Sequence, residues 1–239
     1  MAVPSAPDRS ATTTRTLQVC RTCGGGAPVD VHFCPQSSQI LSLGRHGDYF
    51  AFLGIPRKLT VDAEDLEQRF RALSRQFHPD YFYNATPAER RASLERSSYL
   101  NDAFRTLKSP IARAEYLLGL EGFAARTPEE ASKQVPPDLL EEVFALNEEL
   151  DEIRALRASG APDDAWRLRL ERARQPIEAK RDAHARELEA LSAEWDSLIE
   201  SRTPNEAERR RILESLRARV LERTYISNLL EGIERELNA

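Results

Sequence analysis

The 239-residue sequence contains few glycines (10), few cysteines (3) and a single methionine, and it lacks any long apolar run. Together with frequent Ala, Leu, Glu and Arg, scarce glycine favours helices over sheets. A membrane-spanning helix needs about 20 consecutive apolar residues, so we expect no membrane association. All cysteines precede residue 35, and their odd count suggests a reducing compartment and a metal site rather than a disulfide framework.

The charge balance is acidic. Although 31% of the residues are charged, the formal net charge of −5 argues against general nucleic-acid binding. The apolar share of 41% is enough to bury a core in one large domain or two small ones. The N-terminus lacks a secretory apolar region and is rich in Ser, Thr and Ala. We therefore expect a cytoplasmic protein, with the mitochondrial matrix as the alternative.

Changes in composition divide the chain into five segments. Neither an internal repeat nor strand-like alternation of useful length is visible. We therefore predict an all-α fold, in which a helical hairpin is followed by a three-helix bundle and preceded by a small irregular segment with the cysteines. The expected segments are a disordered tail (1–19), the cysteine-containing segment (20–43), the hairpin unit (48–122), a linker (123–138) and the bundle (139–239).

The hairpin unit carries helix starts and stops in its sequence. Asp48 and Gly54 bracket a short aromatic helix. The next helix should end near Phe77, because Pro79 disfavours helical geometry at the residue before it. The apolar face of that helix is predicted to carry Leu66, Phe70, Leu73 and Phe77. Two further helices are predicted to start at Thr86-Pro87 and at Ser109-Pro110. Two antiparallel helices joined by a tip loop follow from this pattern.

Three long charged helices with short breaks fill the C-terminal part. Gly160-Ala161-Pro162 ends the first helix, Pro176 is expected to kink or interrupt the second, and Thr203-Pro204 opens the third. A coiled coil would also fit the charged pattern, but the interruptions favour a bundle that folds back on itself. The predicted helices span residues 138–157, 163–201 and 203–237.

The tip loop contains His78-Pro79-Asp80. Taken alone, the tripeptide fits a helix stop followed by a polar turn. As a general base His78 lacks a nucleophile or acid nearby, so we expect no catalytic residue. Its context is more informative, because a basic amphipathic helix leads into the tripeptide and another helix leads away. This arrangement resembles the J domain of DnaJ-type co-chaperones.

Further segments resemble the HscB family, the J-domain co-chaperones of iron–sulfur cluster assembly. The similarity covers the chain from Asp48 to the C-terminus. It is specific, because generic J domains lack the segment after Asn101 and are not followed by such a bundle. The segments that carry it are Asp48-Tyr49-Phe50, Leu53-Gly54-Ile55-Pro56, residues 77–82, residues 101–118 and residues 146–153.

The resemblance implies that the tripeptide binds a DnaK-type chaperone and accelerates its ATP hydrolysis. Pro79 restricts the loop, and the Asp80 carboxylate can accept charge-assisted hydrogen bonds from an arginine of the partner. Arginines on the preceding helix would speed the encounter with an acidic surface, although a solvated helix face is the alternative for each of them. These residues are Arg69, Arg71 and Arg75.

The resemblance also implies that the bundle binds an IscU-type scaffold, on which iron–sulfur clusters are built. Apolar and acidic side chains, four residues apart on the first bundle helix, would form the contact together with one apolar residue of the last helix. They are Leu140, Phe144, Glu148, Glu152 and Val220. Burial of Leu140 and Phe144 in the bundle core is the alternative. Glu141 and Ala145 depart from the family's pattern, which puts the detailed contacts in doubt.

The cysteines follow the spacing C-x2-C-x10-C-x2-S, with Cys20, Cys23, Cys34 and then Ser37. This segment resembles the N-terminal zinc knuckle of some HscB-type proteins, which has cysteine at all four positions. Structural zinc is thus an open expectation, with His32, His46 or water to replace the fourth thiolate. A decayed site with loose glycines at Gly24–Gly26 is the alternative. A contact that forms a homodimer is also open.

Three other functions compete with this prediction. A generic J protein would deliver unfolded clients and bind no scaffold. A structural coiled-coil protein would explain the charged C-terminal half but not residues 49–118. An enzyme with a cysteine nucleophile would need a triad that the Pro-rich and Gly-rich surroundings do not show.

Overall fold

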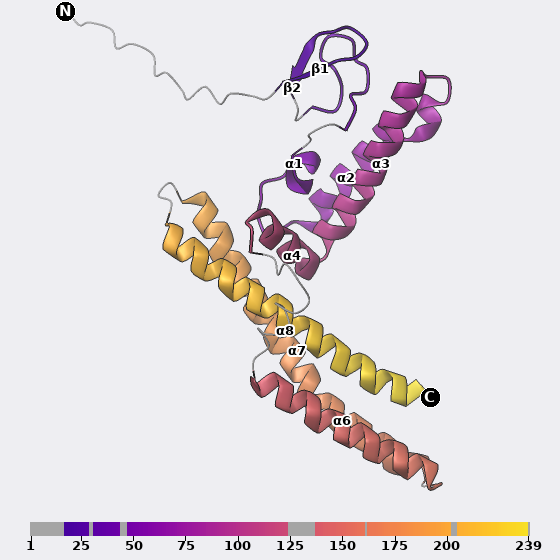
Figure 1. Ribbon diagram of the computed structural model, residues 1–239, viewed down its shortest axis with the longest axis vertical. Coiled ribbons are helices and arrows are strands. Elements are labelled where there is room, and N and C mark those ends of the chain that lie inside the picture. Colours follow the sequence, from indigo (N-terminus) through magenta and orange to yellow (C-terminus); the bar gives the residue numbers. More distant parts are fainter. Residues whose placement is uncertain are drawn as a thin grey trace, which may run out of the picture. The chain divides into compact units, whose positions relative to one another are not determined.

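The computed structural model describes residues 17–28, 31–43, 47–123, 137–160, 162–201 and 205–238, and helices dominate it (Figure 1). The predicted all-α class is confirmed. The elements are β1 (Leu17–Val19), β2 (Gly26–Pro28), α1 (Tyr49–Leu53), α2 (Ala63–Phe77), the 3₁₀ turn η1 (Pro79–Phe82), α3 (Pro87–Lys108), α4 (Pro110–Leu120), α6 (Pro137–Ala158), α7 (Asp163–Glu200) and α8 (Glu206–Asn238).

The chain forms two compact units. The first combines residues 1–56 with 63–105, and the second combines residues 57–62 with 106–239. The second unit therefore contains α4, which the sequence assigned to the hairpin unit at 48–122. The predicted domain boundary at residue 122 remains a prediction. No helix in the described parts of the chain has the length and apolar content that crossing a bilayer requires.

A short antiparallel ribbon begins the first unit. Leu17 of β1 pairs with Pro28 of β2, and Val19 pairs with Gly26. The sequence had placed residues 17–19 in the tail and predicted no strand, because a strand of three residues is too short for alternation to show. The cysteine segment thus contributes one strand, β2, to a short hairpin, and residues 1–16 lie outside the described range.

Local hydrogen bonds set the helix ends of the first unit as predicted. Asp48 caps α1 by accepting a hydrogen bond from the backbone N–H of Ala51 at 3.0 Å, and Gly54 ends α1 in the left-handed region at φ 68°. At the start of α3, the Thr86 hydroxyl accepts a hydrogen bond from the Glu89 backbone N–H. The Glu89 carboxylate in turn accepts one from the backbone N–H of Thr86, which completes a capping box.

Helices α2 and α3 form the predicted antiparallel hairpin. The rings of Phe70 and Phe104 stack with their centroids 4.2 Å apart. At a second contact between the same helices, the Ser93 hydroxyl donates a hydrogen bond to the carbonyl oxygen of Phe77 at 2.6 Å. Because a later residue of α2 meets an earlier residue of α3, the two helices run in opposite directions. Phe77 is fully buried at the end of α2.

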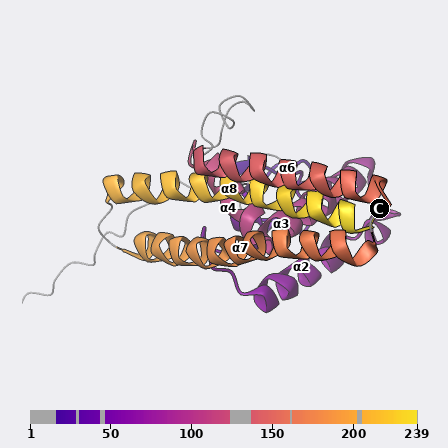
Figure 2. The same cartoon turned by 90° about the horizontal axis from the view of Figure 1, so that it is seen from below.

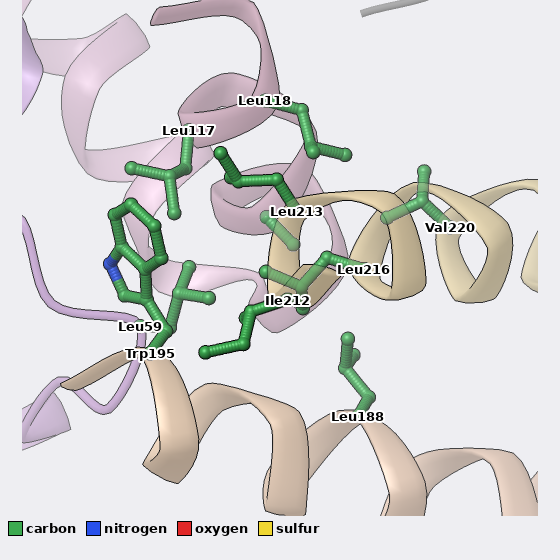
Figure 3. Close-up of a cluster of buried hydrophobic side chains, with 10 residues drawn as sticks. Leu59, Leu117, Leu118, Leu188, Trp195, Ile212, Leu213, Leu216 and Val220 are labelled. Atoms are coloured by element: carbon green, nitrogen blue, oxygen red, sulfur yellow. The ribbon is translucent and has the colours of Figure 1, made fainter. Parts of the chain in front are cut away.

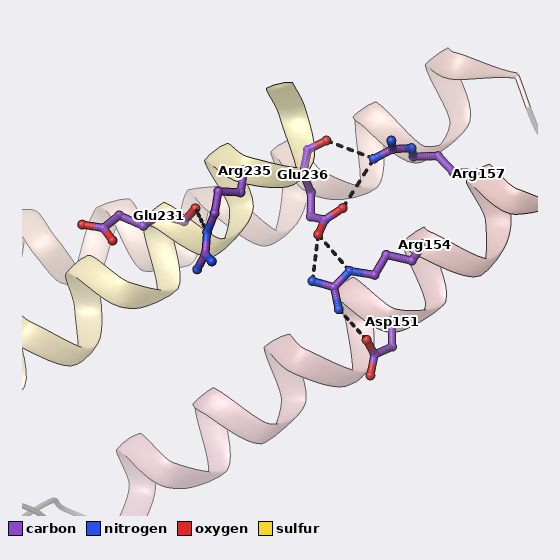
Figure 4. A network of polar contacts seen from close by, with 6 residues as sticks. All are labelled: Asp151, Arg154, Arg157, Glu231, Arg235 and Glu236. Carbon is purple, nitrogen blue, oxygen red and sulfur yellow. Dashed lines mark hydrogen bonds and ion pairs between the residues drawn. The ribbon is translucent and has the colours of Figure 1, made fainter. Parts of the chain in front are cut away.

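In the second unit, α6, α7 and α8 lie side by side as the predicted bundle (Figure 2). One apolar cluster joins all three helices and contains Leu146, Ile153, Trp166, Leu170 and Ile233. Charged side chains reinforce the contact between α6 and α8, where the Glu236 carboxylate pairs with Arg154 at 2.7 Å and with Arg157 at 3.4 Å (Figure 4).

Pro176 does not interrupt α7, which continues from Asp163 to Glu200 with this proline inside, so of the two predicted outcomes the interruption is wrong and the kink remains a prediction. A proline removes one backbone hydrogen bond, which costs the helix about 3 kcal/mol. Here Ala173 and Ile177, on either side, pack against the core that α6 and α8 share with α7. Tertiary packing therefore outweighs the local preference.

A second core lies where α4 meets α7 and α8 (Figure 3). Leu117 and Leu118 of α4 pack against Leu213 and Leu216 of α8 and against Trp195 of α7. Ser109 caps α4 as predicted, by accepting a hydrogen bond from the backbone N–H of Ala112. The packing of α4 explains why it belongs to the second unit.

Candidate functional site

The tripeptide His78-Pro79-Asp80 lies at an exposed turn between α2 and η1. The side chain of Asp80 is 87% exposed, and that of His78 is 52% exposed. His78 caps η1, because its Nδ1 accepts a hydrogen bond from the backbone N–H of Asp80 at 3.3 Å. The tip is therefore neither buried nor part of a continuous helix, so a partner can reach the Asp80 carboxylate.

The base of this tip is anchored on α3. The hydroxyl groups of Ser93 and Ser97 both donate to the carbonyl oxygen of Phe77, at 2.6 Å and 2.9 Å. This satisfies a carbonyl that the end of α2 would otherwise leave without a helical partner. Pro79 then turns the chain away from the α2 axis, since its ring fixes one backbone torsion. A fixed base and a stiff turn hold Asp80 in a narrow range of positions.

Two tyrosines beside the tip were missed by the sequence reasoning. Tyr81 is 74% exposed and Tyr83 is 77% exposed, which is unusual for such large side chains. Tyrosine combines a large apolar ring with a hydroxyl group and is frequent at protein interfaces. The aromatic run Tyr81-Phe82-Tyr83, directly after Asp80, could have indicated this surface. In the structure, the turn after Asp80 leaves both tyrosine side chains exposed.

The three predicted arginines of α2 differ in their surroundings. Arg69 pairs with Asp65 at 2.8 Å and donates to the carbonyl oxygen of Gly54 at 3.0 Å, so it joins α2 to the end of α1. Arg71 pairs with Glu67 at 2.6 Å on the helix surface. Arg75 is exposed near the tip. Arg69 thus fits a structural role, while Arg71 and Arg75 are exposed on the surface of α2.

The predicted scaffold-binding stripe runs along α6. Phe144 is 68% exposed and Glu148 is exposed, so the alternative that Phe144 belongs to the core is wrong. Glu152 is exposed too and pairs with Arg169 of α7 at 2.7 Å. Leu140 belongs to α6, but its side chain lies outside the described residues. Of the predicted stripe, the exposed ring of Phe144 and the exposed carboxylates of Glu148 and Glu152 therefore remain as the candidate contact surface.

Val220 does not fit an exposed contact surface. It is only 7% exposed and belongs to the core cluster with Leu188 and Leu216 (Figure 3). Its burial follows from the helical spacing of the apolar residues of α8, which are buried together. We therefore leave Val220 out of the candidate surface.

The structure brings the three cysteines together. The ligand atoms of Cys20, Cys23 and Cys34 lie within 4.8 Å of one another, and the sulfurs of Cys23 and Cys34 are 3.7 Å apart. A tetrahedral zinc site with Zn–S bonds of about 2.3 Å places its sulfurs about 3.8 Å apart, so the spacing fits. The Ser37 hydroxyl lies 3.5 Å from the Cys20 sulfur, at the predicted fourth position.

Hydrogen bonds lower the pKa of two of these thiols. The Ser37 hydroxyl, and then the backbone N–H groups of Cys23 and Thr22, lower the pKa of Cys20 to about 6. Ser37 is also the largest cause of a lowered pKa at Cys34. Because thiolates are the form of cysteine that binds metal, this cluster could hold a metal ion such as zinc.

The expected ligand role of His32 and the expected looseness of the glycines are both wrong. His32 is outside the cluster, since its Nδ1 accepts a hydrogen bond from Arg96 at 2.7 Å and its ring packs against Phe52. The glycines are not loose, because Gly25 accepts a backbone hydrogen bond from Cys20 at 2.8 Å and Gly26 begins β2. The other predicted replacement, His46, lies outside the described residues.

Two solved structures are similar to this chain over most of its length. One is the human co-chaperone protein HscB, with 26% identity and a TM-score of 0.68, and the match covers 92% of this chain and 98% of the human chain. The other is the chaperone HscB from Vibrio cholerae, with 26% identity and a TM-score of 0.58, covering 80% of this chain and 98% of that chain. No family model matches the sequence. The predicted resemblance to HscB-type co-chaperones is confirmed.

Proposed function

We propose that this chain, with its HscB-type fold, is a J-type co-chaperone of iron–sulfur cluster assembly. It stimulates the ATPase of a DnaK-type chaperone and delivers an IscU-type scaffold to it. The observation that carries the proposal is the exposed, anchored tip at His78-Pro79-Asp80 in a chain that matches HscB structures over most of its length. The chain then regulates catalysis in its partner and performs none itself.

The tip would act through the Asp80 carboxylate. An exposed carboxylate can accept paired hydrogen bonds from an arginine of the chaperone, and such charge-assisted bonds are directional. The exposed Arg75, near the end of α2, adds positive charge, and Tyr81 and Tyr83 add apolar surface that contact would bury. Stimulation follows if these groups bind the hydrolysis-prone state of the chaperone more tightly than its resting state.

The scaffold would bind on α6. Phe144 offers an apolar centre, and Glu148 and Glu152 offer negative charge one and two turns later. Interfaces of this kind have an apolar core and a polar rim. Glu152 would have to exchange or share its ion pair with Arg169, so Phe144 and Glu148 should contribute more of the binding energy.

The cysteine cluster would bind zinc with a structural role. Zinc would cross-link the two turns of the hairpin through Cys20, Cys23 and Cys34, and Ser37 or water would complete the coordination. No step of the chaperone cycle needs this metal. Its contribution would be the stability of the N-terminal hairpin.

The decisive experiment measures steady-state ATPase activity of a DnaK-type chaperone with the wild-type chain or Asp80→Asn, each with and without an IscU-type scaffold. The proposal predicts that wild type stimulates the ATPase, that the scaffold increases the stimulation further, and that Asp80→Asn abolishes both effects. Asp164→Asn is the matched control, since it removes the same charge from an exposed position of α7. Equal stimulation by wild type and Asp80→Asn would refute the proposal.

The second candidate function is a generic J-domain co-chaperone that delivers unfolded clients. The exposed tip supports it equally well, whereas the exposed Phe144 of α6 favours the scaffold. Replacing the scaffold with an unfolded protein in the same assay separates the two. Further stimulation by the unfolded protein alone would favour the generic function.

A further inference from the structure

Arg96 of α3 is fully buried in the first unit, and its side chain bonds to the cysteine segment (residues 20–43). Its Nε donates a hydrogen bond to the carbonyl oxygen of Leu41 at 2.7 Å, and its Nη2 donates one to the carbonyl oxygen of Ser42 at 3.1 Å. Its Nη1 lies 2.7 Å from Nδ1 of His32, which accepts the bond because a guanidinium group can only donate. Docking of the segment therefore satisfies a charged group whose burial would otherwise be unfavourable.

The same segment packs on the side chain of Phe77, the last residue of α2. The His32 ring lies edge-on to the Phe77 ring, with the centroids 5.0 Å apart, and the Phe33 ring stacks on it at 6.0 Å. The guanidinium carbon of Arg96 lies 5.7 Å from the centroid of the Phe77 ring. Since Phe77 is fully buried, the segment forms part of the surroundings that hold this ring.

Phe77 is also the base of the exposed tip. Its carbonyl oxygen accepts hydrogen bonds from Ser93 and Ser97 of α3, so the residue is held at its backbone by α3 and at its ring by the cysteine segment. Asp80 follows three residues later, and Pro79 restricts the chain between them. A shift of Phe77 would therefore move the Asp80 carboxylate, whose own side chain is 87% exposed.

The part of the segment that meets Phe77 is joined to the cysteine cluster. Leu41 packs with Cys20 and Cys34 in one buried cluster, while its carbonyl oxygen bonds to Arg96. The backbone N–H of Leu41 donates a hydrogen bond to the carbonyl oxygen of His32 at 3.0 Å. This bond fixes the two contacts of the segment with Arg96 relative to each other, so the fold around the cysteines determines how the segment meets the end of α2.

We propose that Arg96, His32 and Phe33 are positioning residues of the chaperone-binding tip. They hold the cysteine segment against Phe77, and this keeps Asp80 in the orientation that a DnaK-type chaperone binds. The inference rests on the proposed function and adds to it a role for the cysteine segment. When only a fraction of the molecules presents the tip correctly, the apparent affinity for the chaperone falls by that fraction. The segment thus raises this affinity through the tip and needs no contact of its own with the chaperone.

The first test measures the mobility of the tip by NMR relaxation in the whole chain without a partner. Phe33→Ala removes one ring from Phe77, and Arg96→Met removes the three donors but keeps an apolar side chain of similar length. The backbone N–H groups of Asp80 and Tyr81 both donate to His78. We expect their order parameters to fall from about 0.85 in the wild type to below about 0.6 in both variants. The order parameters of residues 66–72 of α2 should stay unchanged.

The second test titrates the same proteins into a steady-state ATPase assay of the DnaK-type chaperone. The concentration that gives half-maximal stimulation should rise about fivefold in both variants, while the maximal stimulation stays within about twofold, because the chaperone selects the correctly oriented fraction. Calorimetric titration with an IscU-type scaffold should give the wild-type affinity, since the proposed scaffold surface belongs to α6. A change in apparent affinity at constant maximal stimulation distinguishes positioning from direct participation.

Two controls accompany these variants. Arg91→Met removes an exposed arginine of the same helix, and Phe33→Tyr retains the ring at the position that Phe33→Ala empties. Both should match the wild type in both tests. Circular dichroism checks that each variant is folded, and Phe33→Ala alone decides if Arg96→Met does not fold, because Phe33 is only partly buried.

Wild-type order parameters at the tip of Phe33→Ala would overturn the proposal. A loosened tip with an unchanged half-maximal concentration would also overturn it, since the segment would then have no effect on chaperone binding. Absence of stimulation by the wild type would instead refute the proposed function, and the order parameters would still decide whether the cysteine segment holds the tip.

Discussion

The imidazole Nδ1 of His78 accepts a hydrogen bond from the backbone N–H of Asp80 at 3.3 Å. Pro79, between them, has no N–H group of its own, so this bond satisfies the first free donor of the turn. The ring of His78 also lies edge-on to Tyr81 at 6.1 Å. His78 therefore orients the loop that presents the Asp80 carboxylate.

Removing this bond should reduce activity without unfolding the chain. In His78→Ala, the turn gains conformations in which Asp80 is misplaced, so we expect stimulation of the chaperone ATPase to fall about tenfold or more. Because the side chain is half exposed, the free energy of unfolding should change by less than about 0.5 kcal/mol. An ATPase titration and urea denaturation measure the two quantities. Asn84→Ala, an exposed polar residue of the same loop, is the control.

Phe144 and Leu146, two residues apart on α6, should behave differently. Phe144→Ala should weaken scaffold binding about tenfold and leave the melting temperature unchanged, because this ring is 68% exposed. Leu146→Ala should lower the free energy of unfolding by about 2–5 kcal/mol, since Leu146 is 7% exposed in the core. Calorimetric titration with the scaffold and thermal denaturation test both. Retained binding in Phe144→Ala would remove this residue from the proposed surface.

Asp196 should be important for the stability of the second unit. Its carboxylate accepts hydrogen bonds from the backbone N–H groups of Leu59 at 2.7 Å and Thr60 at 2.8 Å, which fastens residues 57–62 to α7. In Asp196→Asn, one of the two N–H groups would face an amide donor. We expect a loss of about 1–3 kcal/mol in urea denaturation. Asp182→Asn, an exposed residue of the same helix, should lose far less.

The metal site can be tested through its fourth position. If the cluster binds zinc, Ser37→Cys should complete four thiolates and slow the loss of zinc to a chelator about tenfold. Ser42→Cys, at an exposed serine outside the cluster, should have no such effect. Elemental analysis and a chelator competition measure zinc content and release. Zinc near zero in both the wild type and Ser37→Cys would contradict a zinc site.

The local features of the fold could be predicted from the sequence. Asp48, Gly54, Thr86 and Ser109 mark helix ends because their hydrogen bonds or torsions involve residues only a few positions away. The exposed tip at His78-Pro79-Asp80 followed from the same kind of reasoning, since Pro79 disfavours helical geometry at the residue before it and α2 ends at Phe77. Such features are decided within one or two turns of chain.

Features that depend on distant residues were decided only by the tertiary structure. Val220 is buried because it packs in the core cluster that α4, α7 and α8 share, and α7 continues through Pro176 where Ala173 and Ile177 pack against the core of the bundle. Sequence pattern shows which side chains of one helix share a face, whereas the partner of that face depends on packing between elements far apart in the chain.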